Sequence, residues 1–369
     1  MKWFVRAVGL SLMMQAAGVV GQTPIEAPDQ APPKATTPAQ VQTQAGAPIE
    51  RRAPVTTIKV QTRLINVPLN VADEHGAPVG GLTVDDFKLA EDGRPQKIVV
   101  FERETSAPLS IVLAIDGSES VLRDENLERN AAKHFIKALM RPQDELDLME
   151  FSDTVREIVS FTNDQRRIET GLGELQRGDA TALYDAIYLA SERLGETHAA
   201  PVAAKASRGG KTASVASGSA GENPEANPEA LRRRVIVLIT DGGDTVKGSR
   251  YMQALEQAQR AGAMVYSLII VPVYADAGRN TGGEHALIQM ADDTGGKYYY
   301  VTEPKDLEPA LRRVSDDLRT QYLLGYYAPA RDAEKDDASG PRTISIKLKD
   351  PALAQKSDLR YRKTYYEAR

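Results

Sequence analysis

Short apolar runs alternate along the chain with segments whose apolar residues recur at helical spacing. Residues 109–115 and 235–239 are almost continuously apolar, a pattern typical of parallel strands that are buried on both faces. Residues 182–194 carry one apolar stripe at helical spacing, and a further helix is expected over 164–175, after a strand at 146–151. This alternation predicts an α/β fold, a doubly wound, mostly parallel, Rossmann-like sheet with helices on both faces.

The segments that flank this region have a strand-like pattern instead. Residues 57–104 are rich in β-branched residues with partial alternation and are interrupted by turns. Strands are also predicted near the end of the chain, at 321–327, 342–348 and 359–366. Each flank is too small to fold alone. We therefore expect residues 57–104 and 321–369 to form one β-sandwich-like domain, into which the α/β domain (105–320) is inserted.

Two segments show neither the helical spacing nor the strand-like alternation of apolar residues. Residues 22–56 are rich in Pro, Ala, Gln and Thr, which predicts a mobile linker. Residues 198–228 are mostly Ala, Gly, Ser, Lys and Pro and are expected to form a disordered insertion within the α/β domain. This insertion contains Gly-Gly-Lys-Thr, but the earlier glycine of a phosphate-binding loop is replaced by Lys205, so no nucleotide site is expected.

The first 21 residues resemble an export signal. A start with Lys2 and Arg6 is followed by a short apolar run and by small residues before Gln22, where cleavage is expected. An uncleaved membrane anchor is the alternative, although the run is short and polar for a membrane span. The chain contains no cysteine, which excludes a lipoprotein anchor, disulfides and thiolate metal sites. These features predict a secreted or periplasmic protein.

The overall charge argues against one class of partner. The chain has 46 basic and 51 acidic residues and a net charge of −5. No basic excess is available to neutralise a phosphate backbone, so nucleic acid is not expected as a partner.

Three polar clusters follow predicted strands or precede a predicted helix, where open α/β sheets bind their ligands. Asp116, Ser118 and Ser120 follow the first buried strand, Thr181 stands at the entry to a helix, and Asp241 follows the strand at 235–239. Every one of these donors is an oxygen. Oxygen ligands suit hard cations, so Mg²⁺ is the favoured ion, with Mn²⁺ or Ca²⁺ as alternatives.

These motifs together resemble the metal-ion-dependent adhesion site of von Willebrand factor A (VWA) domains. The resemblance rests on Asp-x-Ser-x-Ser, on a Thr before Ala-Leu-Tyr-Asp-Ala-Ile, and on Ile-Thr-Asp-Gly, and it extends over about residues 109–318. It implies that Ser118, Ser120 and Thr181 bind the ion directly or through water, whereas Asp116 and Asp241 act mainly through water. The family often has Gly-Gly-Thr in the second loop, where this chain has Asp-Ala-Thr.

The flanks add a second resemblance, to a group of secreted bacterial VWA-related proteins. It is carried by residues 67–101, with Gly-Ala-Pro-Val-Gly-Gly-Leu-Thr-Val-Asp-Asp-Phe followed by Glu-Asp-Gly, and by Tyr-Leu-Leu-Gly-Tyr-Tyr at 322–327. This group implies an architecture rather than a particular task.

The VWA resemblance implies a binding module of the adhesion type rather than an enzyme. An Asp or Glu carboxylate of a protein partner would complete the coordination sphere of the ion. Two alternatives remain, namely a structural protein of the cell envelope with a purely structural metal, and a hydrolase. The residues speak against two kinds of hydrolase. A phosphatase of the haloacid dehalogenase type needs an Asp where Ser118 stands, and a serine hydrolase needs glycines in place of Asp116 and Ser120.

Overall fold

A computed structural model describes residues 63–103, 107–118, 125–196, 231–271, 280–329 and 340–367. In the first helix, side chains are described from residue 129 onwards. The predicted signal peptide, linker and insertion lie outside the described residues, as does Ser120.

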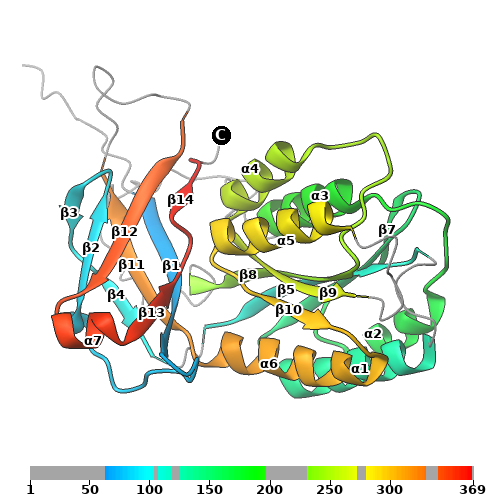
Figure 1. Cartoon of the computed structure of the whole chain (residues 1–369), viewed down its shortest axis with the longest axis horizontal. Coiled ribbons are helices and arrows are strands. Elements are labelled where there is room, and N and C mark those ends of the chain that lie inside the picture. Colours follow the sequence, from blue (N-terminus) through cyan, green and yellow to red (C-terminus); the bar gives the residue numbers. More distant parts are fainter. Residues whose placement is uncertain are drawn as a thin grey trace, which may run out of the picture. The chain divides into compact units, whose positions relative to one another are not determined.

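The α/β domain is built on one six-stranded sheet with the strand order β10-β9-β8-β5-β6-β7 (Figure 1). Its strands are β5 (Leu109–Asp116), β6 (Glu145–Phe151), β7 (Val155–Thr162), β8 (Arg233–Thr240), β9 (Ala263–Ile270) and β10 (Tyr298–Val301). All neighbours are parallel except β6 and β7, which are antiparallel. The predicted α/β fold with a mostly parallel sheet is therefore confirmed.

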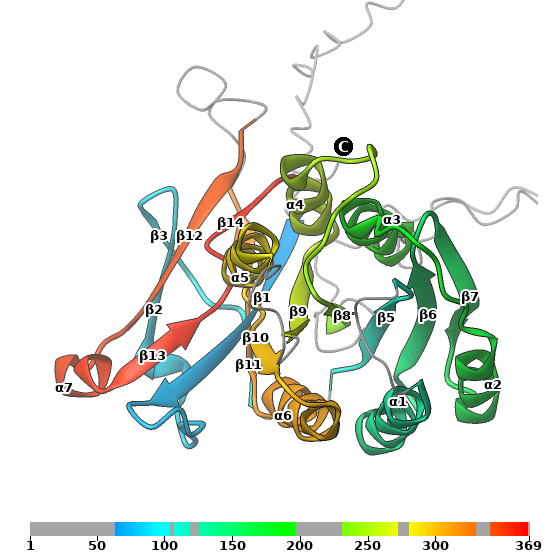
Figure 2. The same ribbon diagram turned by 45° about the vertical axis from the view of Figure 1, so that its right-hand side comes forward.

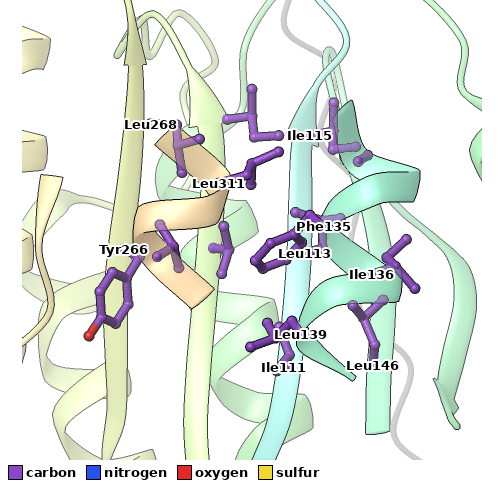
Figure 3. Close-up of a cluster of buried hydrophobic side chains, with 14 of the residues drawn as sticks. Ile111, Leu113, Ile115, Phe135, Ile136, Leu139, Leu146, Tyr266, Leu268 and Leu311 are labelled. Atoms are coloured by element: carbon purple, nitrogen blue, oxygen red, sulfur yellow. The ribbon is translucent and has the colours of Figure 1, made fainter. Parts of the chain in front are cut away.

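Helices cover both faces of this sheet. Helices α1 (Glu125–Leu139) and α6 (Leu307–Arg319) pack on one face. On the other lie α3 (Leu183–Glu196), α4 (Tyr251–Ala261) and α5 (Thr281–Thr294), while α2 (Gln165–Gly171) packs at the β6–β7 edge. Strand β5 is apolar except at Ser110 and at its last residue, Asp116, because helices cover both of its faces. Ile111, Leu113 and Ile115 pack with residues of α1 and α6 (Figure 3), and the residues between them face the other helices.

The prediction of one helix over 164–175 was wrong in part. Helix α2 ends at Gly171 and is followed by a 3-10 turn, and the antiparallel strand β7 before it was not predicted. Strand β7 is an edge strand with mixed burial, so it lacks the continuous apolar run by which the buried strands were identified.

The flanking segments form two four-stranded antiparallel sheets that share one apolar core. One sheet has the order β13-β1-β11-β4 and the other β14-β12-β2-β3. Their strands are β1 (Arg63–Asp73), β2 (Phe87–Glu91), β3 (Arg94–Gln96), β4 (Val100–Glu102), β11 (Tyr322–Ala328), β12 (Arg342–Leu348), β13 (Ser357–Arg360) and β14 (Thr364–Tyr365); a short helix, α7 (Pro351–Gln355), precedes β13. Strands from the two ends of the chain thus pair directly, as Val67 does with Leu324.

The single strand predicted over 359–366 is in fact two strands in different sheets. Strand β13 pairs with β1, and after a short connection β14 pairs with β12. The alternation of apolar residues continues through the change, because Leu359, Tyr361 and Tyr365 all contact the same core. Periodicity therefore could not reveal the point at which the chain changes sheets.

Contacts join these antiparallel sheets to the α/β domain. The carboxylate of Asp317, on α6, accepts hydrogen bonds from Asn70 at 2.7 Å and from Tyr266 at 2.6 Å. Arg360 donates to both oxygens of the same carboxylate, each at 2.7 Å. Strand β14 lies beside α4 in both views (Figures 1 and 2), where Gln259 bonds Thr364 at 2.9 Å. Within the described residues, no helix has both the length and the apolar character that a membrane span requires.

Candidate metal centre

Asp116 is the last residue of β5 and is held by two neighbours. The Thr240 hydroxyl, at the end of the adjacent strand β8, donates to Oδ2 of Asp116 at 2.6 Å. The Ser118 amide donates to Oδ1 at 2.9 Å, and the Ser118 hydroxyl also hydrogen-bonds this carboxylate. Asp116, Ser118 and Thr240 are all buried. The carboxylate is therefore fixed in orientation at the carboxyl edge of the sheet.

The loop that carries Thr181 is packed directly against the loop after β5. The Gly178 amide donates to the Gly117 carbonyl at 3.0 Å, and Ser118 and Gly178 form an isolated parallel bridge. A β-carbon on Gly117 would lie 2.6 Å from the Gln176 carbonyl oxygen, so no larger residue fits here without a shift. This close approach brings the first and second predicted motifs to the same edge.

Thr181 and Asp241 converge beside Gly243. A β-carbon on Gly243 would lie 3.2 Å from Oδ1 of Asp241 and 3.8 Å from the Thr181 hydroxyl oxygen. The Gly243 amide donates to the same Asp241 oxygen at 2.9 Å, which holds the carboxylate against its own loop. Thr245 ties the two loops together, since its amide donates to the Thr181 carbonyl at 2.9 Å. The third motif therefore lies next to the second.

The loop that carries Asp241 depends on two glycines. Gly242 has a φ of +83° and its carbonyl accepts from Asn280 at 3.0 Å. A β-carbon on Gly283, in the first turn of α5, would lie 1.8 Å from the Gly242 carbonyl oxygen. The start of α5 therefore fixes the position of the Asp241 loop, and only glycine permits this approach.

Burial raises the pKa of Asp116 to about 6. The hydrogen bonds from Thr240 and Ser118 oppose this shift, and the nearby negative charge of Asp241 adds to it. A cation near both carboxylates would favour their charged forms. The electrostatics of the site thus suit a positive ion.

The chemistry of the donors can be compared with what a metal requires. Among the described residues, no group of three or more His, Cys, Asp or Glu side chains could hold a metal. The centre offers two carboxylates, and its other donors are the hydroxyls of Ser118 and Thr181. Such an all-oxygen set fits a hard divalent cation and leaves coordination positions for outside oxygens. Ser120 belongs to the same predicted motif but lies outside the described residues.

Several residues near the centre have other roles. Asp179, which replaces a glycine common in the family, is exposed. Asp244 accepts from the Tyr184 amide at the start of α3, and Asp185 accepts from the Ser249 amide at 2.6 Å. Sequence reasoning missed Thr240, although its position at the end of a buried strand, directly before Asp241, was a usable signal.

One family model matches part of the α/β domain. Residues 111–243 match the model of the von Willebrand factor type A domain. No curated protein matches the sequence. Solved structures with partial likeness include the conserved hypothetical protein BatB from Bacteroides thetaiotaomicron (16% identity, TM-score 0.37, 56% of this chain and 99% of that one). Another is an aerotolerance-related membrane protein from Bacteroides fragilis (19% identity, TM-score 0.35, 56% of this chain and 98% of that one). A third is the SpRpn10 VWA domain (13% identity, TM-score 0.37, 55% of this chain and 94% of that one).

Proposed function

Because residues 111–243 form a von Willebrand factor type A domain, and such domains generally mediate protein–protein interactions, we propose that this protein binds a protein partner through a divalent cation. The ion, most simply Mg²⁺, would be held by Ser118 and Thr181, and by Ser120 of the same motif, with Asp116 and Asp241 acting mainly through water. An Asp or Glu of the partner would supply a further oxygen.

The observation that carries this proposal is the convergence of the three motifs at one edge of the sheet. Asp116 is fixed by Thr240, and the side chains of Thr181 and Asp241 approach the same point beside Gly243. Because the direct ligands are mostly neutral hydroxyls, the ion keeps much of its positive charge. It would therefore attract an anionic oxygen from outside.

The proposal includes no catalysis and places the protein outside the cytoplasm. Both oxygens of Asp116 are engaged by hydrogen bonds, which leaves it poorly suited to act as a general base. A substrate screen for hydrolysis tests the first point, and turnover that Asp241→Ala abolishes would refute it. N-terminal sequencing of the exported protein tests the second, with Gln22 expected as the first residue.

Metal binding is tested by calorimetry with Mg²⁺ on the wild type, Asp241→Ala and Asp179→Ala. Asp179 is a matched control, because it is an exposed carboxylate at the same edge and is not a proposed ligand. The wild type and Asp179→Ala should bind Mg²⁺ and gain about 2.7 kcal/mol of stability at a hundredfold excess over Kd. Asp241→Ala should lose both effects and keep its fold.

Partner binding is tested by capture from envelope extract on the same three proteins, with Mg²⁺ and with EDTA. The proposal expects capture by the wild type and Asp179→Ala in Mg²⁺ alone. If Mg²⁺ binds but capture is equal in every condition, the metal is structural and the protein is better described as an envelope scaffold. If Mg²⁺ does not bind at all, the metal centre itself is refuted.

A further inference from the structure

A cavity of about 220 Å³ lies far from the metal centre, where β1, the start of β8, the end of α4 and the chain after β13 meet. Arg233 begins strand β8, whereas Asp241 follows the other end of this eight-residue strand. At about 3.3 Å per residue, the two ends are roughly 25 Å apart. The cavity is therefore a separate feature of the molecule.

Arginine dominates the lining of this cavity. None of its described lining residues is Asp or Glu, and six are arginines: Arg63, Arg232, Arg233, Arg234, Arg260 and Arg362. Arg260 and Arg232 have carboxylate partners, whereas Arg233 is buried and directed at the neutral acceptors of Leu318 and Gln321. Arg260 pairs with Glu256 at 2.5 Å, Arg233 bonds Gln321 at 2.7 Å, and Arg232 lies 3.9 Å from Glu145.

The other three, Arg63, Arg234 and Arg362, have no carboxylate partner among the described residues. Arg234 donates to the Ala261 carbonyl at 2.8 Å, and Arg362 donates to the Asn66 carbonyl at 2.7 Å. The Nε atoms of Arg234 and Arg362 are buried and lack an acceptor in the described part of the chain. Donors therefore remain available on charged groups that are largely removed from water.

The three charges also act on one another. Burial lowers the pKa of Arg362 to about 10, and the positive charges of Arg63 and Arg234 add to this effect. Burial lowers the pKa of Arg234 as well, again with a contribution from Arg63. Arg234 and Arg362 are therefore two like charges largely removed from water, with the exposed Arg63 beside them, and such a cluster costs free energy unless an anion lies between its members.

We propose that this arginine cavity binds a phosphate-class oxyanion, either free or as part of a phosphate monoester. Guanidinium groups present parallel N–H donors that match phosphate oxygens, and such charge-assisted bonds are strong. A phosphate has enough oxygens to accept from Arg63, Arg234 and Arg362 together, which a carboxylate with two oxygens does less well. A water molecule takes about 30 Å³ in the liquid, so a cavity of about 220 Å³ has room for several waters. A phosphate with a small substituent, which is a few times the size of a water molecule, therefore fits in the cavity.

Calorimetric titration with inorganic phosphate at constant ionic strength tests this on the full chain. We expect one site per chain in the wild type. Arg63→Gln and Arg234→Gln should each weaken phosphate binding at least tenfold, the range of one charge-assisted hydrogen bond. Arg63 is exposed, so its variant should fold. Arg312→Gln is the matched control, because Arg312 is exposed and pairs with Glu308 away from the cavity.

Further titrations distinguish a free phosphate ion from a phosphate monoester, and the arginine cavity from the metal centre. Binding of glycerol phosphate as well as inorganic phosphate would indicate a monoester, and binding of inorganic phosphate alone a free ion. Asp241→Ala and EDTA should leave phosphate binding unchanged, which makes the test independent of the metal centre. Absence of binding above a chloride control, or equal affinity in wild type and Arg63→Gln, would overturn the proposal.

Discussion

Asp147 is a buried carboxyl group whose protonation should control how stability depends on pH. It lies on β6, is 0% exposed, and its side chain faces Glu157 on β7. Neither of its oxygens has an N–H or hydroxyl donor in the described structure, so a hydrogen bond between Asp147 and the Glu157 carboxylate requires a proton shared by the two groups. Burial, together with Glu157, raises the pKa of Asp147 to about 9.

The shared proton resides on Asp147 because Glu157 has a cation beside it. Arg193, on α3, bonds the Glu157 carboxylate at 2.7 Å. Although burial acts to raise the pKa of Glu157, the hydrogen bonds from Asp147 and Arg193 lower it. At neutral pH the native state therefore contains a neutral Asp147 and a charged Glu157.

The sign of the pH dependence follows from this. In the unfolded chain Asp147 has its ordinary pKa of 3.8, so between about pH 4 and 9 the native state binds one more proton than the unfolded state. The contribution of Asp147 to the free energy of unfolding is present in full below about pH 4. It is lost as the pH rises through this window, by about 1.4 kcal/mol per pH unit. Between pH 5 and pH 8 the loss is about 4 kcal/mol.

We predict that Asp147→Asn removes this dependence, because an amide has the shape of the neutral acid and does not titrate. Urea denaturation at pH 5, 6, 7 and 8, with EDTA present, gives the free energy of unfolding of each protein. The free energy of unfolding of the variant, minus that of the wild type, should increase by about 4 kcal/mol from pH 5 to pH 8. Asp292→Asn, at an exposed position on α5, is the control. Parallel pH profiles for wild type and Asp147→Asn would refute the reasoning.

Two further predictions concern the Asp241 loop and the antiparallel sheets. Gly283→Ala should weaken Mg²⁺ binding at least tenfold in calorimetry, because its methyl group would displace the Gly242 carbonyl, whereas Gly282→Ala, with its nearest neighbour at 3.8 Å, should bind normally. Arg342→Met should lower the free energy of unfolding in urea by about 3–5 kcal/mol, because it leaves the buried carboxylate of Glu91 without its cation. Equal Mg²⁺ affinity in the two glycine variants, or an Arg342→Met protein as stable as wild type, would contradict these expectations.

The sequence alone was enough to predict the α/β fold and the edge at which the proposed metal centre lies. The strands at 109–115 and 235–239 are recognisable because burial on both faces favours apolar residues, and Ser110 is their one polar residue. Asp116 and Asp241 follow these strands directly, and parallel strands end at the same edge. Local sequence therefore determines both the elements and the placement of these carboxylates.

Only the tertiary structure decided how distant segments meet. The antiparallel strand β7, the change of sheet after Arg360, and the bond between Thr240 and Asp116 all depend on which strands become neighbours. The arginine cavity likewise gathers Arg63, Arg234 and Arg362 from segments far apart in the chain. A residue's own neighbours in sequence carry no record of such pairings, because the free energy that selects them comes from packing of the whole core.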